Sequence, residues 1–318
     1  MQRRVFLAAT TALMMLGAPA MAENIPVRVG YIADFWGTSI TAIASDQGLW
    51  EKHGLDAQLS VFTNGPIQVQ ALGAGSLDFG YVGPGALWLP ASGQAKIVAV
   101  NGVGFSDRVI AQEGIDSIED LRGKRVAVPE GTSGDMLLRL ALERADMTVD
   151  DVELIRMDPS TVVSAFASGQ VDAAGIWYPL VGTIKEHRPA LVELASNSDF
   201  FPERTFPSAF VARNEVADEH PELVSRMVAV IKEAQDFRTE NMDEAVAITA
   251  RFLNVEESHL ATEAENGRSL SSAELVELTR DGNVDGWLDG MAEMYVTFGR
   301  LEDPIPASEY YLGAQYAE

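Results

Sequence analysis

The segment over residues 131–134 contains residue types that could bind a negatively charged ligand. It reads Gly-Thr-Ser-Gly, follows an apolar stretch expected to be a strand at 125–129, and opens a helical pattern over 134–145. A threonine or serine at this place can cap a helix, and the free N–H groups of a first helical turn attract anions without a basic side chain. The pattern therefore predicts either a cap that serves only its own helix or an anion-binding helix end formed by Thr132, Ser133 and Gly134.

Two further segments place turn residues directly before a predicted helix. Asn64-Gly65-Pro66 leads into a helix over about 66–74, and Gly83-Pro84-Gly85 follows a strand expected at 78–82. If these two helix N-termini and that of residues 132–134 converge on one cleft, their dipoles form an anion site that carries no net charge. The alternative for Gly83-Pro84-Gly85 is a plain tight turn.

Aromatic pairs follow two of the expected strands. Phe35 and Trp36 come after the strand at 27–32, and Trp177 and Tyr178 come after the strand at 171–176. Such rings can enclose the apolar part of a ligand, while the indole N–H and the phenol O–H can donate hydrogen bonds. The alternative is that they pack in cores, as most aromatic residues do, and Trp88 inside a helical pattern is expected to be structural.

The elements that would position these residues alternate along the chain. Apolar runs expected as strands at 27–32, 57–62 and 78–82 are separated by helical patterns at 39–53 and 66–74, and the rhythm repeats from residue 125 to residue 176. This alternation predicts parallel sheets covered by helices. After residue 215 the patterns are helical, over 221–240, 242–253 and 284–299.

An internal similarity appears when the chain is shifted by 94 residues. ALGAGSLDFG, from Ala71, then lies over AFASGQVDAA, from Ala165, and the neighbouring strands fall in register. The alternative is that Gly and Asp at these places are ordinary punctuation between helices and strands. Two equivalent α/β lobes would bring the loops after their strands to a shared cleft, where ligands of open sheets bind.

The composition excludes several functional classes. The chain has 318 residues, 47 acidic against 23 basic side chains and no cysteine. Its acidity argues against nucleic acid and anionic membranes as partners, and the lack of cysteine excludes thiolate chemistry. His53, His187, His220 and His259 show no paired spacing, and there is no P-loop and no G-x-S-x-G motif, so no metal, cofactor or catalytic residue is expected.

Residues 1–22 read as an export signal. A basic start, Arg3-Arg4, precedes an apolar run that ends in the small residues before Ala22, after which cleavage is expected. The two adjacent arginines also fit a twin-arginine signal, so the export route stays open. Without these two arginines the net charge changes from −24 to −26, and the chain is expected in the periplasm.

Four stretches together resemble the type II periplasmic binding proteins of the nitrate, alkanesulfonate and taurine group. They are VRVGYIADFWGT, the stretch from SDQGLWEKHGL to GPGAL, SIEDLRGKRVAVPEGTSGDMLLRLAL and FASGQVDAAGIWYP, within about residues 27–255. The resemblance implies an α/β fold with two lobes, 24–106 plus 209–318 and 107–208, each a mostly parallel sheet flanked by helices. It also implies a ligand cleft between the lobes, an ABC permease and ATPase as partners, and a monomeric binding protein.

The resemblance also guides the ligand hypothesis. Taurine-binding relatives place an acid where this chain has Ser208, which weakens taurine as the ligand, although Asp34 or Asp135 could supply a carboxylate or could be a turn or cap residue. A small alkanesulfonate is the preferred ligand. A thiamin pyrimidine or another aromatic heterocycle is the alternative, followed by an enzyme on the same fold. The related enzyme that makes a thiamin pyrimidine precursor has a cysteine-containing signature, which this chain lacks. A receptor that signals through a membrane sensor would have the same sequence pattern.

Overall fold

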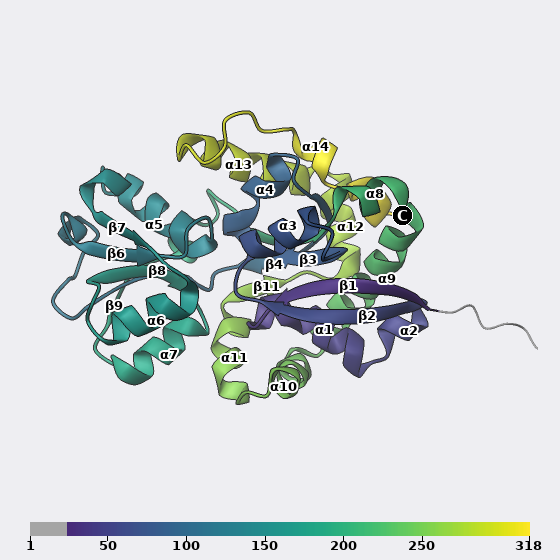
Figure 1. Cartoon of the computed structure of the whole chain (residues 1–318), viewed down its shortest axis with the longest axis horizontal. Coiled ribbons are helices and arrows are strands. Elements are labelled where there is room, and N and C mark those ends of the chain that lie inside the picture. The colour runs from purple at the N-terminus through teal and green to yellow at the C-terminus, as the bar shows by residue number, and fades with distance from the viewer. Residues whose placement is uncertain (1–23) are drawn as a thin grey trace, which may run out of the picture.

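The computed structural model describes residues 24–318 and shows two α/β lobes side by side, each built on one β-sheet (Figure 1). The first sheet has the strand order β11-β4-β10-β3-β1-β2. Its strands are β1 (Ile25–Ile32), β2 (Leu55–Phe62), β3 (Phe79–Val82), β4 (Lys96–Gly104), β10 (Pro207–Ala212) and β11 (Gly267–Ser269). The strands β1 and β2 pair in parallel along their whole length.

Helices from both ends of the chain surround the first sheet, and those from the C-terminal part correspond to the helical patterns predicted after residue 215. Those from the N-terminal part are α1 (Phe35–Asp46), α2 (Leu49–Lys52), α3 (Gly65–Gly73), η1 (Pro84–Ala86) and α4 (Trp88–Ala91). Those from the C-terminal part are α8 (Asn214–Glu219), α9 (Pro221–Glu240), α10 (Met242–Leu253), α11 (Glu257–Glu265), α12 (Ser272–Arg280), α13 (Asn283–Thr297), α14 (Ala307–Tyr310) and α15 (Gly313–Tyr316). Helix α1 packs against α9 and α10.

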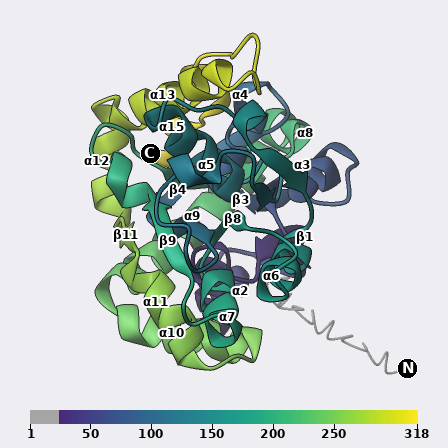
Figure 2. The ribbon, with the colours of Figure 1, turned by 90° about the vertical axis from the view of Figure 1, so that its left-hand side faces the viewer.

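The second sheet has the order β7-β6-β8-β5-β9. Its strands are β5 (Asp107–Ala111), β6 (Arg125–Val128), β7 (Glu153–Arg156), β8 (Ala173–Trp177) and β9 (Val192–Ser196). Its helices are η2 (Glu119–Leu121), α5 (Ser133–Arg144), η3 (Val149–Asp151), α6 (Pro159–Ala167), α7 (Leu180–His187) and η4 (Asn197–Phe200). Helix α5 covers one face, and α6 and α7 cover the other (Figures 1 and 2).

The two-lobed α/β fold is confirmed, and most strands of each sheet run in one direction, although β10 and β11 in the first sheet and β5 in the second run the opposite way. The strands β1, β2 and β3 run parallel, as do β6, β7 and β8, whereas β10 is antiparallel to β3 and β4. In the second sheet β5 is antiparallel to both β8 and β9. The physical reason is the path of the chain, because β4 leads out of the first sheet, β5 starts the second, and β10 brings the chain back.

The repeated Asp of the internal similarity has the same structural role in both lobes. Asp78, just before β3, accepts hydrogen bonds from the backbone N and the Nε of Arg28 in β1, both at 3.0 Å. Asp172, just before β8, accepts from the backbone N and the Nε of Arg125 in β6, at 2.9 and 3.2 Å. Each Asp thus joins the starts of two parallel strands, so the repeat positions the strands and leaves their far ends free to form a site.

The hydrogen bonds of Asp78 and Asp172 to arginine predict that the fold loses stability in acid. Burial favours the neutral form of both carboxyls, but hydrogen bonds from Arg28 and Arg213 hold the pKa of Asp78 below its ordinary value, and those from Arg125 do the same for the pKa of Asp172. A carboxyl whose pKa is lower in the folded state stabilises the fold above its unfolded pKa of about 3.9, and this contribution is lost as the pH falls further. We expect Asp78→Asn to lower the urea midpoint at pH 6 and to flatten the decline below pH 4, whereas Asp116→Asn, at an exposed site, should leave the wild-type profile. An undiminished decline in Asp78→Asn would contradict this.

The expected signal at residues 1–22, with cleavage after Ala22, lies outside the described residues. Within residues 24–318, no helix is both long and apolar enough to cross a membrane.

Candidate functional site

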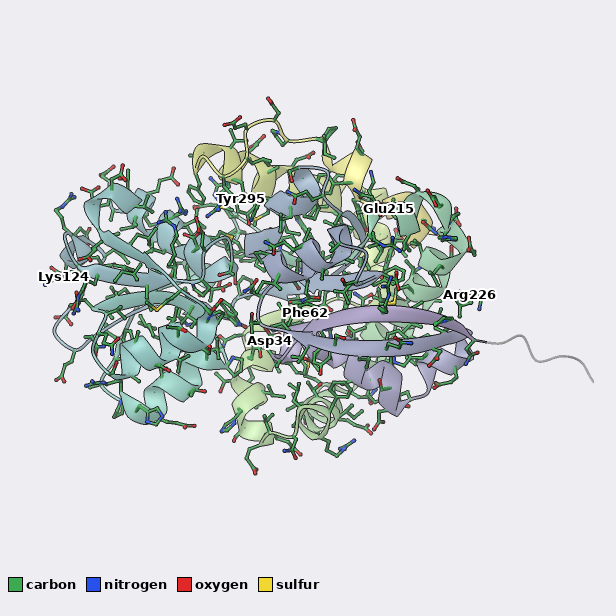
Figure 3. The ribbon with its side chains drawn as sticks, in the orientation of Figure 1. Asp34, Phe62, Lys124, Glu215, Arg226 and Tyr295 are labelled. Atoms are coloured by element: carbon green, nitrogen blue, oxygen red, sulfur yellow. The ribbon has the colours of Figure 1, made fainter. Side chains whose placement is uncertain are left out.

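A cavity of about 60 Å³ lies between the two sheets, with walls from both lobes. By volume it holds a handful of waters, at roughly 10–15 Å³ of such space for each, so it suits a small ligand. The first lobe contributes Ile32, Asp34, Trp36, Asn64, Gly65, Pro66, Tyr81, Gly83, Pro84, Ala86, Gly104, Ser208 and Glu263. The second lobe and its junction contribute Ser106, Asp107, Thr132, Ser133 and Trp177. Figure 3 shows Asp34 at the junction of the two lobes.

The N-terminus of α5 reaches this cavity, as the sequence suggested. Thr132 and Ser133 line it. The Thr132 hydroxyl donates to the Pro129 carbonyl at 2.7 Å and does not cap the helix within the described chain. Gly134 does not line the cavity, because it packs against the backbone of Gly175 in β8. Its role is to allow the helix to lie close to the sheet.

The other two segments also reach the cavity, although not with every residue. Asn64 and Gly65 line it at the start of α3, where the Asn64 Oδ1 caps the helix by accepting from the Ile67 N–H at 3.1 Å. Gly83 and Pro84 line it as well. Gly85 lies instead in contact with the backbone of Thr132 and Ser133, so it is a contact between the lobes.

The aromatic residues divide into two groups. Trp36 and Trp177 line the cavity from opposite lobes. Phe35 is fully buried in the core of the first lobe, because it is the first residue of α1 and faces the packed interior. Tyr81 of β3 lines the cavity although the sequence reasoning did not select it, since its apolar strand reads only as core.

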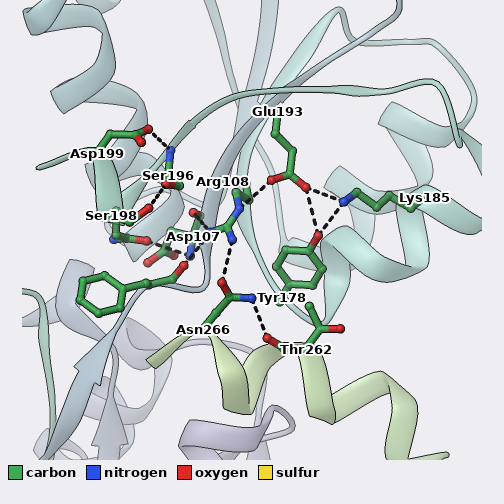
Figure 4. Close-up of polar contacts among 12 residues, drawn as sticks. Asp107, Arg108, Tyr178, Lys185, Glu193, Ser196, Ser198, Asp199, Thr262 and Asn266 are labelled. Atoms are coloured by element: carbon green, nitrogen blue, oxygen red, sulfur yellow. Dashed lines mark hydrogen bonds and ion pairs between the residues drawn. The ribbon is translucent and has the colours of Figure 1, made fainter. Parts of the chain in front are cut away.

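Tyr178 points away from the cavity, contrary to expectation. Its hydroxyl donates to Glu193 at 3.0 Å and accepts from Lys185 Nζ at 2.7 Å. Arg108 lies over its ring at 5.3 Å and pairs with Glu193 at 2.8 Å (Figure 4). Trp177 is the last residue of β8 and lines the cavity, whereas Tyr178, the next residue, does not line it.

Three acidic side chains line the cavity from distant parts of the sequence: Asp34 after β1, Asp107 at the start of β5, and Glu263 in α11. All three are buried. The Asp34 carboxylate caps α1 by accepting from the Gly37 N–H at 2.6 Å. Glu263 accepts from the N–H groups of Phe35 and Trp36, at 2.6 and 3.4 Å.

Burial perturbs the titration of all three acids. It raises the pKa of Asp34 to about 7, with repulsion from Asp107 adding to the rise. It raises the pKa of Asp107 to about 6, although the side chains of Ser133 and Asn197 favour its ionised form. Burial and the charge of Asp34 raise the pKa of Glu263 well above its usual value. Asp107 and Glu263 were not among the residues predicted from the sequence, because nothing local marks either residue as part of a site.

Two other expected positions can now be placed. Ser208 lines the cavity, and its hydroxyl accepts from Asn101 Nδ2 at 3.3 Å. Asp135 does not line it. It accepts from the Gly131 N–H at 2.9 Å and pairs with Arg139 and Arg300, at 2.9 and 3.1 Å. Asp135 therefore stabilises the α5 terminus and the contact between lobes.

The lobes meet on the α13 side of the cavity. Tyr295, labelled in Figure 3, donates to the Pro84 carbonyl and contacts Met136 Sδ of the other lobe at 3.6 Å. Trp88 Nε1 donates to the Gly131 carbonyl at 3.4 Å. Over residues 24–318, no group of three or more His, Cys, Asp or Glu side chains is arranged to hold a metal ion.

Comparison with known proteins places this geometry in context. Residues 38–245 match the family model described as "NMT1/THI5 like". A Brucella abortus protein named "Putative binding protein" is 72% identical over 312 residues, which cover 98% of each chain. The taurine-binding periplasmic protein of Escherichia coli is 26% identical over 237 residues, 73% of this chain and 72% of that one.

A solved structure shows the same fold. The alkanesulfonate-binding protein SsuA from Xanthomonas axonopodis pv. citri, bound to MOPS, superposes with a TM-score of 0.72 at 20% identity. The match covers 92% of this chain and 99% of that one.

Proposed function

Because this chain belongs to the NMT1/THI5-like family, we propose that it is a solute-binding protein that captures a small organic ligand between its lobes for an ABC importer. The observation that carries the proposal is the cavity lined from both lobes, with Trp36 on one side and Trp177 on the other. A pocket at a lobe interface, with apolar walls and a few convergent polar groups, is a typical ligand site.

In this proposal the two sequence-defined units, 24–106 plus 209–318 and 107–208, are the bodies that close on the ligand. The mature protein begins after Ala22, resides in the periplasm as a monomer, and meets a membrane permease with its ATPase. Proteins similar to this chain are named as taurine-, alkanesulfonate- and nitrate-binding proteins, which supports a solute-binding role. An alkanesulfonate is the ligand that the sequence favoured, and a thiamin pyrimidine or other heterocycle is the alternative.

A thermal-shift screen of residues 23–318 tests the proposal. The panel contains taurine, longer alkanesulfonates, sulfate esters, nitrate and thiamin pyrimidines. A ligand that binds only the folded state raises the melting temperature by mass action. We expect a saturable rise with one chemical class, and failure of every compound to shift the melting temperature would count against the function.

Enzyme activity is the second candidate, because a buried carboxyl with a pKa of about 7, such as that of Asp34, could act as a general base. The two functions differ in what happens to the bound compound. A binding protein returns it unchanged, so mass spectrometry before and after prolonged incubation separates them.

Trp177→Ala is expected to weaken binding of the compound identified by the screen by roughly 1–3 kcal/mol, because the indole wall of the cavity is lost. The matched control is Tyr178→Phe, which changes the next aromatic residue but only removes contacts to Lys185 and Glu193. Calorimetry should show an effect in the first variant alone. Equal affinities of Trp177→Ala and wild type, with the fold intact, would remove Trp177 from the site.

A further inference from the structure

We propose that the ligand carries a protonated nitrogen, and that Asp34, Asp107 and Glu263 recognise it as a carboxyl trio. The inference rests on the proposed solute-binding function and narrows its ligand class. It replaces the neutral anion site that the sequence suggested. A plain alkanesulfonate without a basic nitrogen is then a poor ligand for this cavity.

The first support is the position of the trio. Asp34 follows β1, Asp107 begins β5 and Glu263 lies in α11, yet all three side chains line one cavity of about 60 Å³. All three are buried, Asp107 raises the pKa of Asp34, and Asp34 and Asp107 both raise the pKa of Glu263. Asp34 and Glu263 accept hydrogen bonds from the first N–H groups of α1, but mutually repelling carboxylates in one cavity still require a further partner when they ionise.

The second support is the arrangement of positive charge. Among the described residues, no lysine, arginine or histidine lines the cavity. Arg108 donates to Glu193, to the carbonyls of Phe105 and Asp107, and to Asn266 (Figure 4). Arg238 donates to Ser39, Asn101 and Ser269, below Trp36. Both guanidinium groups are bonded to other partners, which leaves the trio to be neutralised by protons or by a ligand.

The third support is an unused acceptor. Asp107 is only 4% exposed and lines the cavity. Its Oδ1 has no hydrogen-bond partner anywhere in residues 24–318. The Ser133 and Asn197 side chains lie near enough to favour the ionised form of Asp107, but neither donates a hydrogen bond to this oxygen. A ligand N–H that donated to it would satisfy an unfavourable buried acceptor.

Two of the helix N-termini near the cavity, those of α1 and α5, already face acids. The first N–H groups of α1 donate to Glu263 and Asp34. At α5, Ser133 lies close enough to Asp107 to favour its ionised form. An anion placed at either end would meet a carboxylate. A nitrogen cation would gain from the same carboxylates.

The test compares matched probes that differ only at the nitrogen. One set shares a sulfonate: taurine, isethionate and ethanesulfonate. A second set is a flat ring: 4-aminopyrimidine, 4-methylpyrimidine and benzamidine with benzamide. Propylammonium and nitrate complete the panel. We expect the nitrogen-bearing members of at least one set to bind at least tenfold more tightly than their matched partners.

Two conservative variants identify the residues. Asp107→Asn keeps the shape, and Asp34→Asn keeps a good helix cap, so both should fold. Each is expected to weaken the nitrogen-bearing probe by roughly tenfold or more. Asp116→Asn makes the same change at an exposed site and should not alter affinity.

A pH series adds a readout that a structural role would not change. Burial holds protons on Asp34 and Asp107 up to a pKa of about 7 and about 6, and a cation must displace them. Affinity for propylammonium or for taurine, whose amines stay charged from pH 5 to 8, should rise with pH as Asp107 and then Asp34 lose their protons. Among the other charged or titratable groups, Arg108 favours the ionised form of Asp107, Asp34 and Glu263 raise the pKa of Tyr81 while Arg238 opposes them, and Asp107 raises the pKa of Tyr295.

The outcomes separate the two proposals. If the nitrogen-bearing probes bind more tightly than their matched partners, and if Asp107→Asn loses this difference, the result supports recognition by the carboxyl trio. Equal or tighter binding of isethionate, ethanesulfonate or nitrate overturns the trio and keeps the solute-binding function. Binding of no probe at all, nitrogen-bearing or anionic, overturns both.

Discussion

Gly85→Ala is expected to reduce affinity for the ligand at least tenfold while leaving the fold of each lobe intact. A Cβ at this position would lie far inside van der Waals contact with the backbone of Thr132 and Ser133. Backbone atoms cannot rotate away as a side chain can, so the overlap costs about 1–3 kcal/mol or more unless the lobes separate. Separation opens the cavity, and the ligand loses contacts on one side.

Two measurements check this prediction. Calorimetry gives the affinity for the compound that the screen identifies, and small-angle scattering of the ligand-free variant should give a larger radius of gyration than wild type. The matched control is Gly73→Ala, a glycine in α3 with no atom within 4 Å of an added Cβ. Wild-type affinity in Gly85→Ala would mean that closure does not use this contact.

Arg238→Met is expected to lower the free energy of unfolding by about 3 kcal/mol or more. The guanidinium group is fully buried and donates four hydrogen bonds, to Ser39 of α1, to the carbonyl and side chain of Asn101 in β4, and to Ser269 of β11. Hydrogen bonds to a charged group contribute about 1.5–3 kcal/mol each, and their partners would be left buried without a donor. The Trp36 ring would also lose its contact with the Arg238 guanidinium group.

Urea denaturation measures this change. Arg226→Met is the control on the same helix, because Arg226 is exposed and its removal should cost no more than about 0.5–1 kcal/mol. Arg238→Lys should fall between the two, since lysine keeps the charge but not the fork geometry. A loss in Arg238→Met no larger than that in Arg226→Met would show that the network does not stabilise the fold.

Local patterns were sufficient to predict much of the fold. The strands β1, β2, β3 and β6 are short apolar runs between turn residues, so their alternation with helices could be read directly. The shift of 94 residues identified two equivalent units, and the Asp78 and Asp172 pairings explain why that similarity persists. The helix start at Asn64 was recognisable because capping is a local property, and the start after Thr132 was recognisable from its turn residues, although the Thr132 side chain does not cap the helix.

Strands β5, β9 and β10 were not predicted, and β5 and β10 run antiparallel to their neighbours in the sheets. The strand β5 begins with Asp107 and Arg108, two charged residues that the structure buries. Their burial depends on partners such as Glu193 and Asn197, which lie about 90 residues away in the chain. No local pattern can show that such residues will be satisfied inside the fold.

The sequence by itself determined the fold class, the repeated α/β unit and the loops that meet at the cleft, because each depends on periodicity and turn chemistry over short stretches. Only the tertiary structure decided which side chains of those loops face the cavity. In the folded chain the Tyr178 side chain points away from the cavity and Phe35 lies in the core, while Asp107 and Glu263 line the same cavity as Asp34. The physical reason is that the lining of a site is made of residues that become neighbours only when distant segments pack.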